Sequence, residues 1–453
     1  MSVEVTTRPV CIIGEVLVDV MVPGQADHEA EVKMRLGGVF HAARALWAIG
    51  CPYTLAYLAP SYLDDQIQHY AKHHGATCVS KVGSIVGCPN VMLVREATEA
   101  GPQGYEYLLR DEHNADVDIE ALTSALQEQN CSDVLVFPGG FDLRAALGAV
   151  ASTSARVYLD ANFSDPAFDQ LSPLGRPLDV FILSTSSPLF LDHWGGDVST
   201  FCRDVVGNYA TSALLKENRG GSRFFPSSDA SKLTRVPAQV QQIVHSVGVG
   251  DCYDAVFAHM RHKVSDRAAL CFASLIAAEY ASTTFPDDFK TAVQGVLSIS
   301  SEEIETMRGV QLPWEDRPSY QIYMAAPDFD FVDTRPFDQL VRCLKYHNFS
   351  PRCPVREHGQ IGKDADPSER QATHLADMRL LRQSQMLVAV MLYDDPGTLI
   401  EIGLAHERGI PVIVYDPYHR AENLMLTELP ELVTSDLDEI IARVFTLAAE
   451  APA

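Results

Sequence analysis

The sequence predicts an α/β protein of two domains, and three observations support this prediction. The chain has 453 residues, more than one domain usually holds. Apolar runs of strand length alternate with segments of helical periodicity, which is typical of a mostly parallel sheet covered by helices. The alternation stops where prolines and polar residues gather, and then it starts again. We therefore expect a doubly wound domain over residues 1–308, a linker over 309–320 and a smaller α/β domain over 321–453.

The first domain contains long apolar runs that predict buried strands. "VCIIGEVLVDVMV" and "DVLVFPGG" are examples, whereas "FHAARALWAIG" and "DRAALCFASLIAAEYAS" have the helical period. We expect strands over 10–22, 133–140, 155–163 and 178–186, and helices over 40–50, 118–129 and 266–282.

The second domain repeats the pattern on a smaller scale, and about 130 residues suffice for a small doubly wound domain. "MLVAVMLY" and "PVIVY" predict strands, and "RPFDQLVRCLKYH" predicts a helix. We expect strands over 320–327, 386–393 and 411–415, and helices over 335–347, 369–383, 398–409 and 436–451.

The composition excludes several classes of protein. A net charge of −25 repels phosphate backbones, so we expect no polymeric nucleic-acid partner, although local loops leave a small anionic substrate open. The ten cysteines include no C-x-x-C pair and no zinc spacing, so metal ligands stay unknown. No apolar run approaches a membrane span and the first residues resemble a strand, so we expect a cytoplasmic protein with no membrane partner.

Two glycine-centred stretches stand out in the first domain. Gly37 and Gly38 precede a helical run, where paired glycines admit a ligand close to the backbone or simply form a tight turn. Gly248, Val249 and Gly250 open a second helix.

Asp251 follows these residues at the start of that second helix. Backbone N–H groups at such a helix start can bind an anion. Asp251 could then accept a proton from an attacking hydroxyl while the amides hold a transferring phosphoryl group. The alternative is an aspartate favoured in the first turn by the helix dipole alone.

In this order and separation, the two stretches resemble the ribokinase-like family of sugar and nucleoside kinases (the PfkB family), over residues 8–305. The resemblance implies a ribokinase-like sheet and phosphorylation of a nucleoside or pentose hydroxyl with ATP and Mg²⁺. Within "GEVLVD" it places Asp19 at the sugar hydroxyls, together with Gly37, Gly38 and His41.

The same resemblance implies that Asp251 is the catalytic base and that Gly248, Val249 and Gly250 form the anion hole. "LDANF" is similar to the D-x-N strand of the family, carried here by Asp160 and Asn162.

The sequence departs from the family at four points. The asparagine after the glycine pair is His41, and the Asp-Thr-Thr tied to a monovalent cation reads His245, Ser246, Val247. The N-x-x-E element that organises magnesium is absent from "LSTSSPLF", and the Thr-Leu-Gly of the nucleotide strand reads "KEN" from Lys216. Either the kinase has a modified metal shell, or the domain only binds ligand or supports oligomerisation.

The stretch "DDPGTLIEIGLAH" begins a helix in the second domain and allows two interpretations of Glu401. Thr398 and Glu401 fit a Thr-x-x-Glu capping box, which needs no function. Alternatively, Glu401 is a nucleophile, with Asp395 moving protons and Gly397 keeping the loop open to a planar base.

This stretch resembles the core motif of nucleoside 2-deoxyribosyltransferases, and the resemblance extends over residues 320–430. It implies a flavodoxin-like or Rossmann-like domain that needs no cofactor. Tyr323 in "IYMAAPDF" and Gln360 are then placed at the sugar. Gln385 stands where the family has an aspartate, and Asn423 in "ENLM" is lent by a neighbouring subunit.

The resemblance implies that Glu401 attacks the anomeric carbon and forms a glycosyl intermediate, which a base or water then resolves. Together the two resemblances predict a bifunctional enzyme of nucleoside salvage or catabolism, acting on small molecules as a homo-oligomer with sites completed between subunits. In the alternative, only the C-terminal domain is active. The sequence leaves open whether the C-terminal domain is a transferase or a hydrolase, and whether its substrate is 5′-phosphorylated.

Overall fold

A computed structural model gives the fold, and the chain divides into two compact units. The first comprises Met1–Thr98 and Gln103–Gln311, and the second comprises Glu99–Pro102 and Leu312–Ala453. The residues that the structure describes are 8–22, 32–95, 98–102, 104–161, 171, 175–229, 231–241, 243–362 and 364–451.

A sheet with ten described strands forms the centre of the first unit. Its middle is parallel, and antiparallel strands extend both edges. The parallel strands are, in spatial order, β12 (Ala213–Lys216), β11 (Val180–Ser184), β10 (Arg156–Asp160), β9 (Asp133–Val136), β1 (Val10–Glu15), β4 (Tyr53–Ala59) and β5 (Ala76–Val86). The edge strands are β13 (Ser222–Phe225) and β14 (Thr234–Val236) beside β12, and β8 (Asn114–Val117) beside β5.

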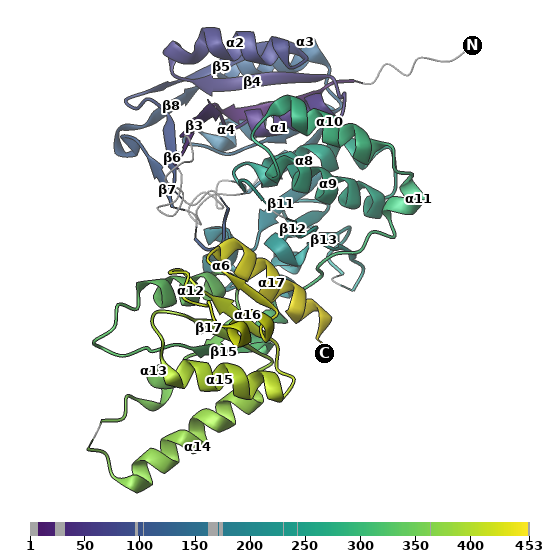
Figure 1. The fold of residues 1–453 in the computed structure, drawn as a ribbon. Coiled ribbons are helices and arrows are strands. Elements are labelled where there is room, and N and C mark those ends of the chain that lie inside the picture. Colours follow the sequence, from purple (N-terminus) through teal and green to yellow (C-terminus); the bar gives the residue numbers. More distant parts are fainter. Residues whose placement is uncertain are drawn as a thin grey trace. The chain divides into compact units, whose positions relative to one another are not determined.

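Helices rich in alanine and leucine cover this sheet. Figure 1 shows α1, α8, α9 and α10 gathered together, and their buried residues share one hydrophobic core with the sheet and α2. α3 and α4 pack against each other elsewhere. The bounds are α1 (Phe40–Ala48), α2 (Asp64–His73), α3 (Ile119–Gln129), α4 (Leu143–Ala151), α6 (Pro188–His193), α7 (Val198–Val205), α8 (Val249–Met260), α9 (Asp266–Ala281), α10 (Pro286–Leu297) and α11 (Ser301–Ile304).

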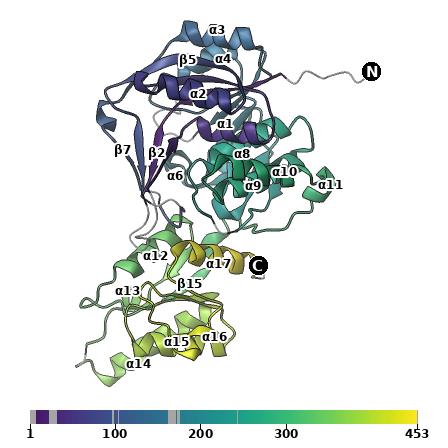
Figure 2. The ribbon, with the colours of Figure 1, turned by 45° about the horizontal axis from the view of Figure 1, so that its top comes forward.

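A small second sheet stands apart from the large one in the first unit, as β2 and β7 show in Figure 2. The run 10–22, predicted as one strand, is in fact two strands in different sheets, because its backbone changes partner. The N–H of Val16 still bonds to Leu58, whereas that of Val18 bonds to Asn90. The strands are β3 (Lys33–Leu36), β2 (Val18–Met21), β6 (Val91–Val94) and β7 (Tyr105–Tyr107).

The second unit has a parallel sheet in the order β16-β15-β17-β18-β19. Together with the large sheet of the first unit, it confirms the predicted α/β class. The strands are β15 (Gln321–Ala325), β16 (Ser350–Arg352), β17 (Met386–Val390), β18 (Val412–Tyr415) and β19 (Leu432–Thr434). The helices are α12 (Arg335–Tyr346), α13 (Pro354–His358), α14 (Pro367–Gln383), α15 (Pro396–Glu407), α16 (Leu424–Glu428) and α17 (Leu437–Glu450).

Part of the segment predicted as a linker is packed inside the second unit. Arg317 is fully buried, and its guanidinium donates to the carbonyl oxygens of Leu312 at 3.2 Å and His347 at 3.3 Å. It also lies 4.9 Å from the ring centre of Phe445. A buried arginine needs such partners, so residues from Leu312 onward help to hold the second unit together. Among the described helices, none is long and apolar enough to cross a membrane.

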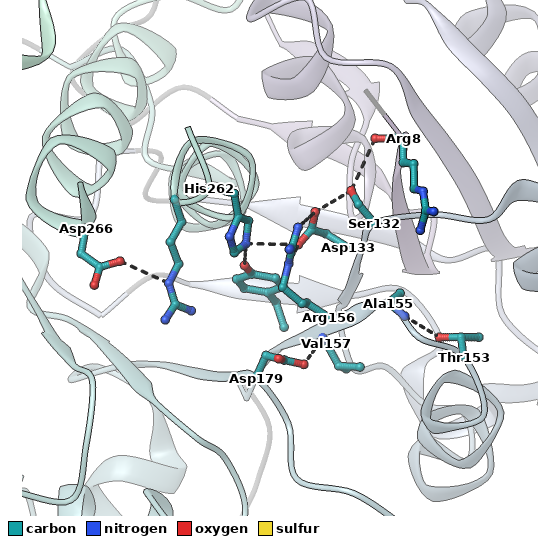
Figure 3. Close-up of polar contacts among 12 residues, drawn as sticks. Arg8, Ser132, Asp133, Thr153, Ala155, Arg156, Val157, Asp179, His262 and Asp266 are labelled. Carbon is teal, nitrogen blue, oxygen red and sulfur yellow. Dashed lines mark hydrogen bonds and ion pairs between the residues drawn. The ribbon is translucent and has the colours of Figure 1, made fainter. Parts of the chain in front are cut away.

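An ion-pair network around the buried Asp133 joins the amino ends of β9 and β10 to the residues that follow α8 (Figure 3). Asp133 accepts from the Nε of Arg156 at 2.7 Å and from the hydroxyl of Ser132 at 2.7 Å. His262, just past the end of α8, lies 3.5 Å from the same carboxylate and 2.9 Å from the hydroxyl of Tyr158. These partners, foremost His262, lower the pKa of Asp133 to about 2 despite its burial.

We expect Asp133→Asn to destabilise the protein by about 2 kcal/mol at neutral pH, because it leaves Arg156 without its charge partner. A carboxyl with a lowered folded pKa stabilises above its ordinary pKa near 3.8, and that stability is lost as the pH falls toward 2. Urea unfolding at pH 7 and near pH 3 measures the difference, which should shrink in acid. The exposed Asp204→Asn is the control, and an equal loss in both variants would contradict the network's role.

Candidate active sites

The carboxyl ends of the parallel strands bring charged side chains to one edge of the large sheet. β10 ends at Asp160 and β12 ends at Lys216. The Nζ of Lys216 lies 3.6 Å from Asp160 Oδ2 and donates to Oδ2 of Asp254, on α8, at 2.8 Å. Carboxyl ends of parallel strands are where open α/β sheets bind ligands, and the first turn of α8 lies at this cluster.

Close packing requires the first of the glycines before Asp251, and the second lies close to a neighbouring side chain. Gly248 is the N-cap of α8 with φ +74°, and a Cβ there would lie 2.0 Å from Cγ of His41. A Cβ on Gly250 would lie 3.1 Å from the Nζ of Lys216. With Val249 between them, the chain enters α8 with backbone N–H groups that have no acceptor within the helix. This start could hold an anion.

Asp251 lies in the first turn of α8, where burial raises its pKa to about 7. The charges of Asp160 and Asp19 raise it further, and Lys216 lowers it. A carboxylate that accepts a proton near neutral pH suits a general base. The alternative, an aspartate favoured by the helix dipole alone, also fits, because Asp251 lies in the first turn of α8.

Asp19 is fully buried on β2, beside the glycine pair and His41. Its Oδ2 lies 3.1 Å from Nε2 of His41 and 3.7 Å from Nε of Arg35. A Cβ on Gly37 would lie 2.0 Å from Asp19 Oδ1. Gly38 has φ +58°, and a Cβ there would lie 2.2 Å from the carbonyl oxygen of Glu15. The glycine pair therefore forms a tight turn that also wraps the Asp19 carboxylate.

His41 links the two glycine stretches through its imidazole. Burial lowers its pKa to about 4, so the ring is neutral at physiological pH. Its Nδ1 lies 2.7 Å from the hydroxyl of Tyr280, and its ring lies against Gly248. Among the described residues, neither oxygen of Asp19 has a well-aligned hydrogen-bond donor. Arg35 thus balances the charge of Asp19 at 3.7 Å, and both oxygens keep acceptor capacity for substrate hydroxyls.

Sequence reasoning missed Glu15, the last residue of β1. Its Oε1 accepts from the N–H of Gly140, and its Oε2 lies 3.3 Å from Nε2 of His113 and 3.7 Å from Nη1 of Arg110. The side chain is buried at the same sheet edge as Asp160. A charged residue that ends a buried apolar strand was the available signal.

The departures from the kinase pattern also have structural positions. Segment 183–190 ends β11 and starts α6, and it offers the buried hydroxyls of Thr185 and Ser187 rather than an amide and a carboxylate. Within the part of the chain that is described, no group of three or more His, Cys, Asp or Glu residues could hold a metal ion. These residues do not fit the expected Mg²⁺-organising element. Asn162 lies outside the described residues.

In the second unit, β15 and α15 bring Tyr323 and Glu401 together. The hydroxyl of Tyr323 donates to Oε1 of Glu401 at 2.6 Å. The capping-box interpretation of Glu401 is wrong, because Asp395 is the N-cap of α15. Oδ2 of Asp395 accepts from the N–H of Thr398 at 2.8 Å and from its hydroxyl at 2.9 Å. Glu401 lies one turn further on and points at Tyr323 instead.

The surroundings of Glu401 raise its pKa to about 7. Burial is the largest cause, the hydrogen bond from Tyr323 lowers the pKa, and the charges of Asp377 and Asp395 raise it. A partly desolvated carboxylate that ionises near pH 7 is a reactive nucleophile once ionised.

Asp377 and His358 were also missed by sequence reasoning. Asp377 on α14 contributes the largest charge effect on Glu401, and its Oδ1 lies 2.6 Å from Nδ1 of His358 at the end of α13. α13, α14 and α15 all contact β15, the strand of Tyr323. No motif marks Asp377, because it lies on a helix whose residues are mostly exposed.

Three predicted residues lie away from these contacts. Gln385 precedes β17 at the amino end of the sheet, where its Oε1 accepts from the N–H of Gln321 at 2.8 Å. Its assignment to the Glu401 site needs correction, since helix starts such as that of α15 lie at the carboxyl end. Gln360 is exposed in the loop after α13. Asn423 is the exposed N-cap of α16 and accepts from the N–H of Met425.

Residues 322–432 match the sequence model of the nucleoside 2-deoxyribosyltransferase family. This match confirms the resemblance inferred for the second domain. No curated protein matches the chain.

Sugar and nucleoside kinases are among the solved structures that match the chain. Fructokinase with bound ATP from Xylella fastidiosa is 16% identical with a TM-score of 0.49, over 64% of this chain and 98% of that one. Adenosine kinase from Sinorhizobium meliloti is 14% identical with a TM-score of 0.49, over 64% and 99%. Arabidopsis thaliana ribokinase complexed with ribose and ATP is 16% identical with a TM-score of 0.47, over 65% and 100%.

We expect Tyr323→Phe to move the pH dependence of any reaction at Glu401. The hydrogen bond from Tyr323 favours the ionised carboxylate, so its loss raises the pKa of Glu401 above about 7. A plot of kcat/KM against pH should then rise at a pH about one unit higher than in the wild type. The exposed Tyr418→Phe is the matched control. An unmoved profile would show that Tyr323 does not tune Glu401.

Proposed function

We propose that the second unit cleaves or exchanges the N-glycosidic bond of a nucleoside through a covalent intermediate on Glu401. The observation that carries this proposal is the partly buried Glu401 carboxylate held by the Tyr323 hydroxyl at 2.6 Å. The pair lies inside the segment that matches the deoxyribosyltransferase family.

The reaction proceeds in two balanced steps. In the first, an oxygen of Glu401 bonds to the anomeric carbon as the bond from that carbon to the base nitrogen breaks. The electron pair stays on the base, which takes up a proton. In the second, a new base or water attacks the same carbon, the bond to Glu401 breaks, and the attacker loses a proton. Two displacements at one carbon retain its configuration.

Proton transfer to and from the nucleobase is assigned to Asp395. Its Oδ2 accepts both hydrogen bonds that cap α15, so Oδ1 takes no part in the cap. The His358–Asp377 pair, in which the charge of Asp377 acts on both Tyr323 and Glu401, provides a second proton carrier. Gly397 keeps side chains away from the entry to α15. Tyr323 directs the nucleophile, and Gln360 is retained as a sugar contact whose loop lies open to solvent.

We further propose that the active assembly is a homo-oligomer in which Asn423 serves a neighbouring site. Asn423 is exposed, and Leu424 and Met425 beside it are 70% and 59% exposed. Adjacent apolar side chains so open to water favour burial against another subunit.

A second activity, phosphorylation of a nucleoside or pentose hydroxyl with ATP, is proposed for the first unit. It is favoured by Asp251, a partly buried carboxylate with a pKa of about 7 at the glycine-rich start of α8. Asp251 would take the proton of the acceptor hydroxyl, while the helix start holds the transferring phosphoryl group. Asp19, with His41 behind it, would orient the acceptor.

The alternative is that the first unit only binds ligand or supports oligomerisation. Thermal unfolding with ATP and Mg²⁺, followed by turnover assays with nucleosides and pentoses, separates the two. No shift and no turnover would remove the kinase proposal and leave the glycosidic one intact.

We expect the full chain to release free base from a nucleoside and Glu401→Ala to lose about 1,000-fold or more in that rate. Chromatography of a nucleoside panel, with and without ATP and a second base, reports the products. Base release without ATP indicates an independent glycosidase, exchanged bases indicate a transferase, and release only with ATP indicates a relay. Glu407→Ala, at the exposed end of α15, is the control. Undiminished base release by Glu401→Ala would refute the nucleophile.

We expect Asp251→Asn to reduce phosphoryl transfer by about 100-fold to 10,000-fold, the usual loss when a general base is removed. Transfer by the wild type should increase with pH up to about 7, because the pKa of Asp251 is raised and only the ionised form accepts a proton. Asp266→Asn, in the first turn of α9, is the control for a helix-start aspartate. Transfer that is indifferent to pH between 5 and 8 would contradict the assignment.

A further inference from the structure

A largely buried lysine lies beside the start of α8, at a position where the sequence showed only a departure from the kinase pattern. Lys216 ends β12, and 14% of its side chain is exposed. Its Nζ donates to Asp254 at 2.8 Å and lies 3.6 Å from Asp160. A buried ammonium ion is costly unless it is paired, so this position must be explained.

The carboxylates around Lys216 would repel any phosphate group that binds beside them. Asp160, Asp251 and Asp254 surround the start of α8, and a phosphoryl group there would meet repulsion from each ionised carboxylate. Lys216 opposes that repulsion. The charges of Asp160 and Asp254 raise the pKa of Lys216 above its ordinary value, so the ammonium keeps its proton.

The ammonium also faces the helix start without a side chain in between. The residue opposite is Gly250, and even a Cβ there would lie 3.1 Å from the Nζ. An ammonium has three N–H donors, of which Asp254 takes one, and Asp160 lies beyond hydrogen-bond distance. Oδ1 of Asp160 and Oδ1 of Asp254 are buried with no hydrogen-bond partner among the described residues. The cluster therefore has donor and acceptor capacity left for a ligand.

We propose that Lys216 is a phosphate-binding residue, whose Nζ contacts the terminal phosphoryl group of a nucleoside triphosphate at the start of α8. This inference rests on the proposed kinase function and deepens it. The acceptor hydroxyl gives its proton to Asp251, and its oxygen bonds to the terminal phosphorus. The bond from that phosphorus to the bridging oxygen breaks, and the electron pair leaves with the nucleoside diphosphate. Lys216 keeps its protons and neutralises charge throughout.

The hydroxyl-lined segment 183–190 is a further reason to assign phosphate binding to Lys216. With no amide–carboxylate pair there to organise Mg²⁺ beside the phosphates, a cation fixed to the chain gains importance, and Lys216 is placed to supply it.

The test compares ATP with ADP, because only ATP carries the terminal phosphoryl group. Isothermal titration of the full chain with each nucleotide, in the presence of Mg²⁺, gives the ratio of their affinities. We expect the wild type to prefer ATP by about tenfold or more, the worth of a charge-assisted contact. Lys216→Met combined with Asp254→Asn removes the ammonium and its partner together, and should bring the ratio to about one with ADP affinity unchanged.

Asp254→Asn alone is the matched control, which should keep the preference for ATP. Thermal unfolding of the three proteins checks the fold. If the double variant unfolds early, Lys216→Arg, which keeps the charge, should retain the preference for ATP. A double variant or a Lys216→Met variant that binds ATP as selectively as the wild type overturns this inference and leaves the kinase proposal standing. A wild type that binds neither nucleotide overturns both.

Discussion

The physical constraint on which both units depend is the cost of keeping a carboxylate away from water at the carboxyl edge of a parallel sheet. Asp251 in the first unit and Glu401 in the second are each raised to a pKa of about 7, chiefly by burial. Each is carried by a helix that starts at this edge, so the sheet order decides which charges gather around it. The surrounding hydrogen bonds and ion pairs moderate the cost of that burial.

The two units offset the cost of burying the carboxylate by different means. Around Glu401, a neutral phenol from Tyr323 donates one short hydrogen bond while Asp377 and Asp395 oppose ionisation. Such a site suits a nucleophile that alternates between a free carboxylate and a covalent glycosyl ester. Around Asp251, the ammonium of Lys216 provides a permanent opposite charge. That arrangement suits a group that must accept a proton beside an incoming anion.

Several features followed from sequence alone, because they depend on local pattern. The strand and helix periods predicted the α/β class, and glycines at a helix start marked the neighbourhood of Asp251. The capping interpretation of Glu401 was wrong although its residue spacing fitted, because Asp395 took the cap position first. Spacing cannot decide between two competent caps, whereas the hydrogen bonds of the folded helix do.

Other features depend on strands that are distant in sequence, and these could not be predicted. Glu15 and Lys216 each end a parallel strand, but only the strand order decides which other charged residues each of them meets at that edge. Gln385 seemed well placed beside β17, yet it lies at the amino end of the strand, opposite to the helix start that carries Glu401. A strand has two ends far apart in space, and a linear motif does not say which end a ligand meets.

By itself, the sequence determined the class of fold, indicated two units and singled out Asp251 and Glu401 as candidate acids on two helices. These follow from hydrophobic period, glycine placement and helix-start chemistry, all of which act over a few residues. The tertiary structure alone decided which groups those acids meet: Lys216 and Asp160 for Asp251, Tyr323 and Asp377 for Glu401. The reason is that electrostatic energy depends on distance and burial in the folded chain, and neither quantity is set by separation along the sequence.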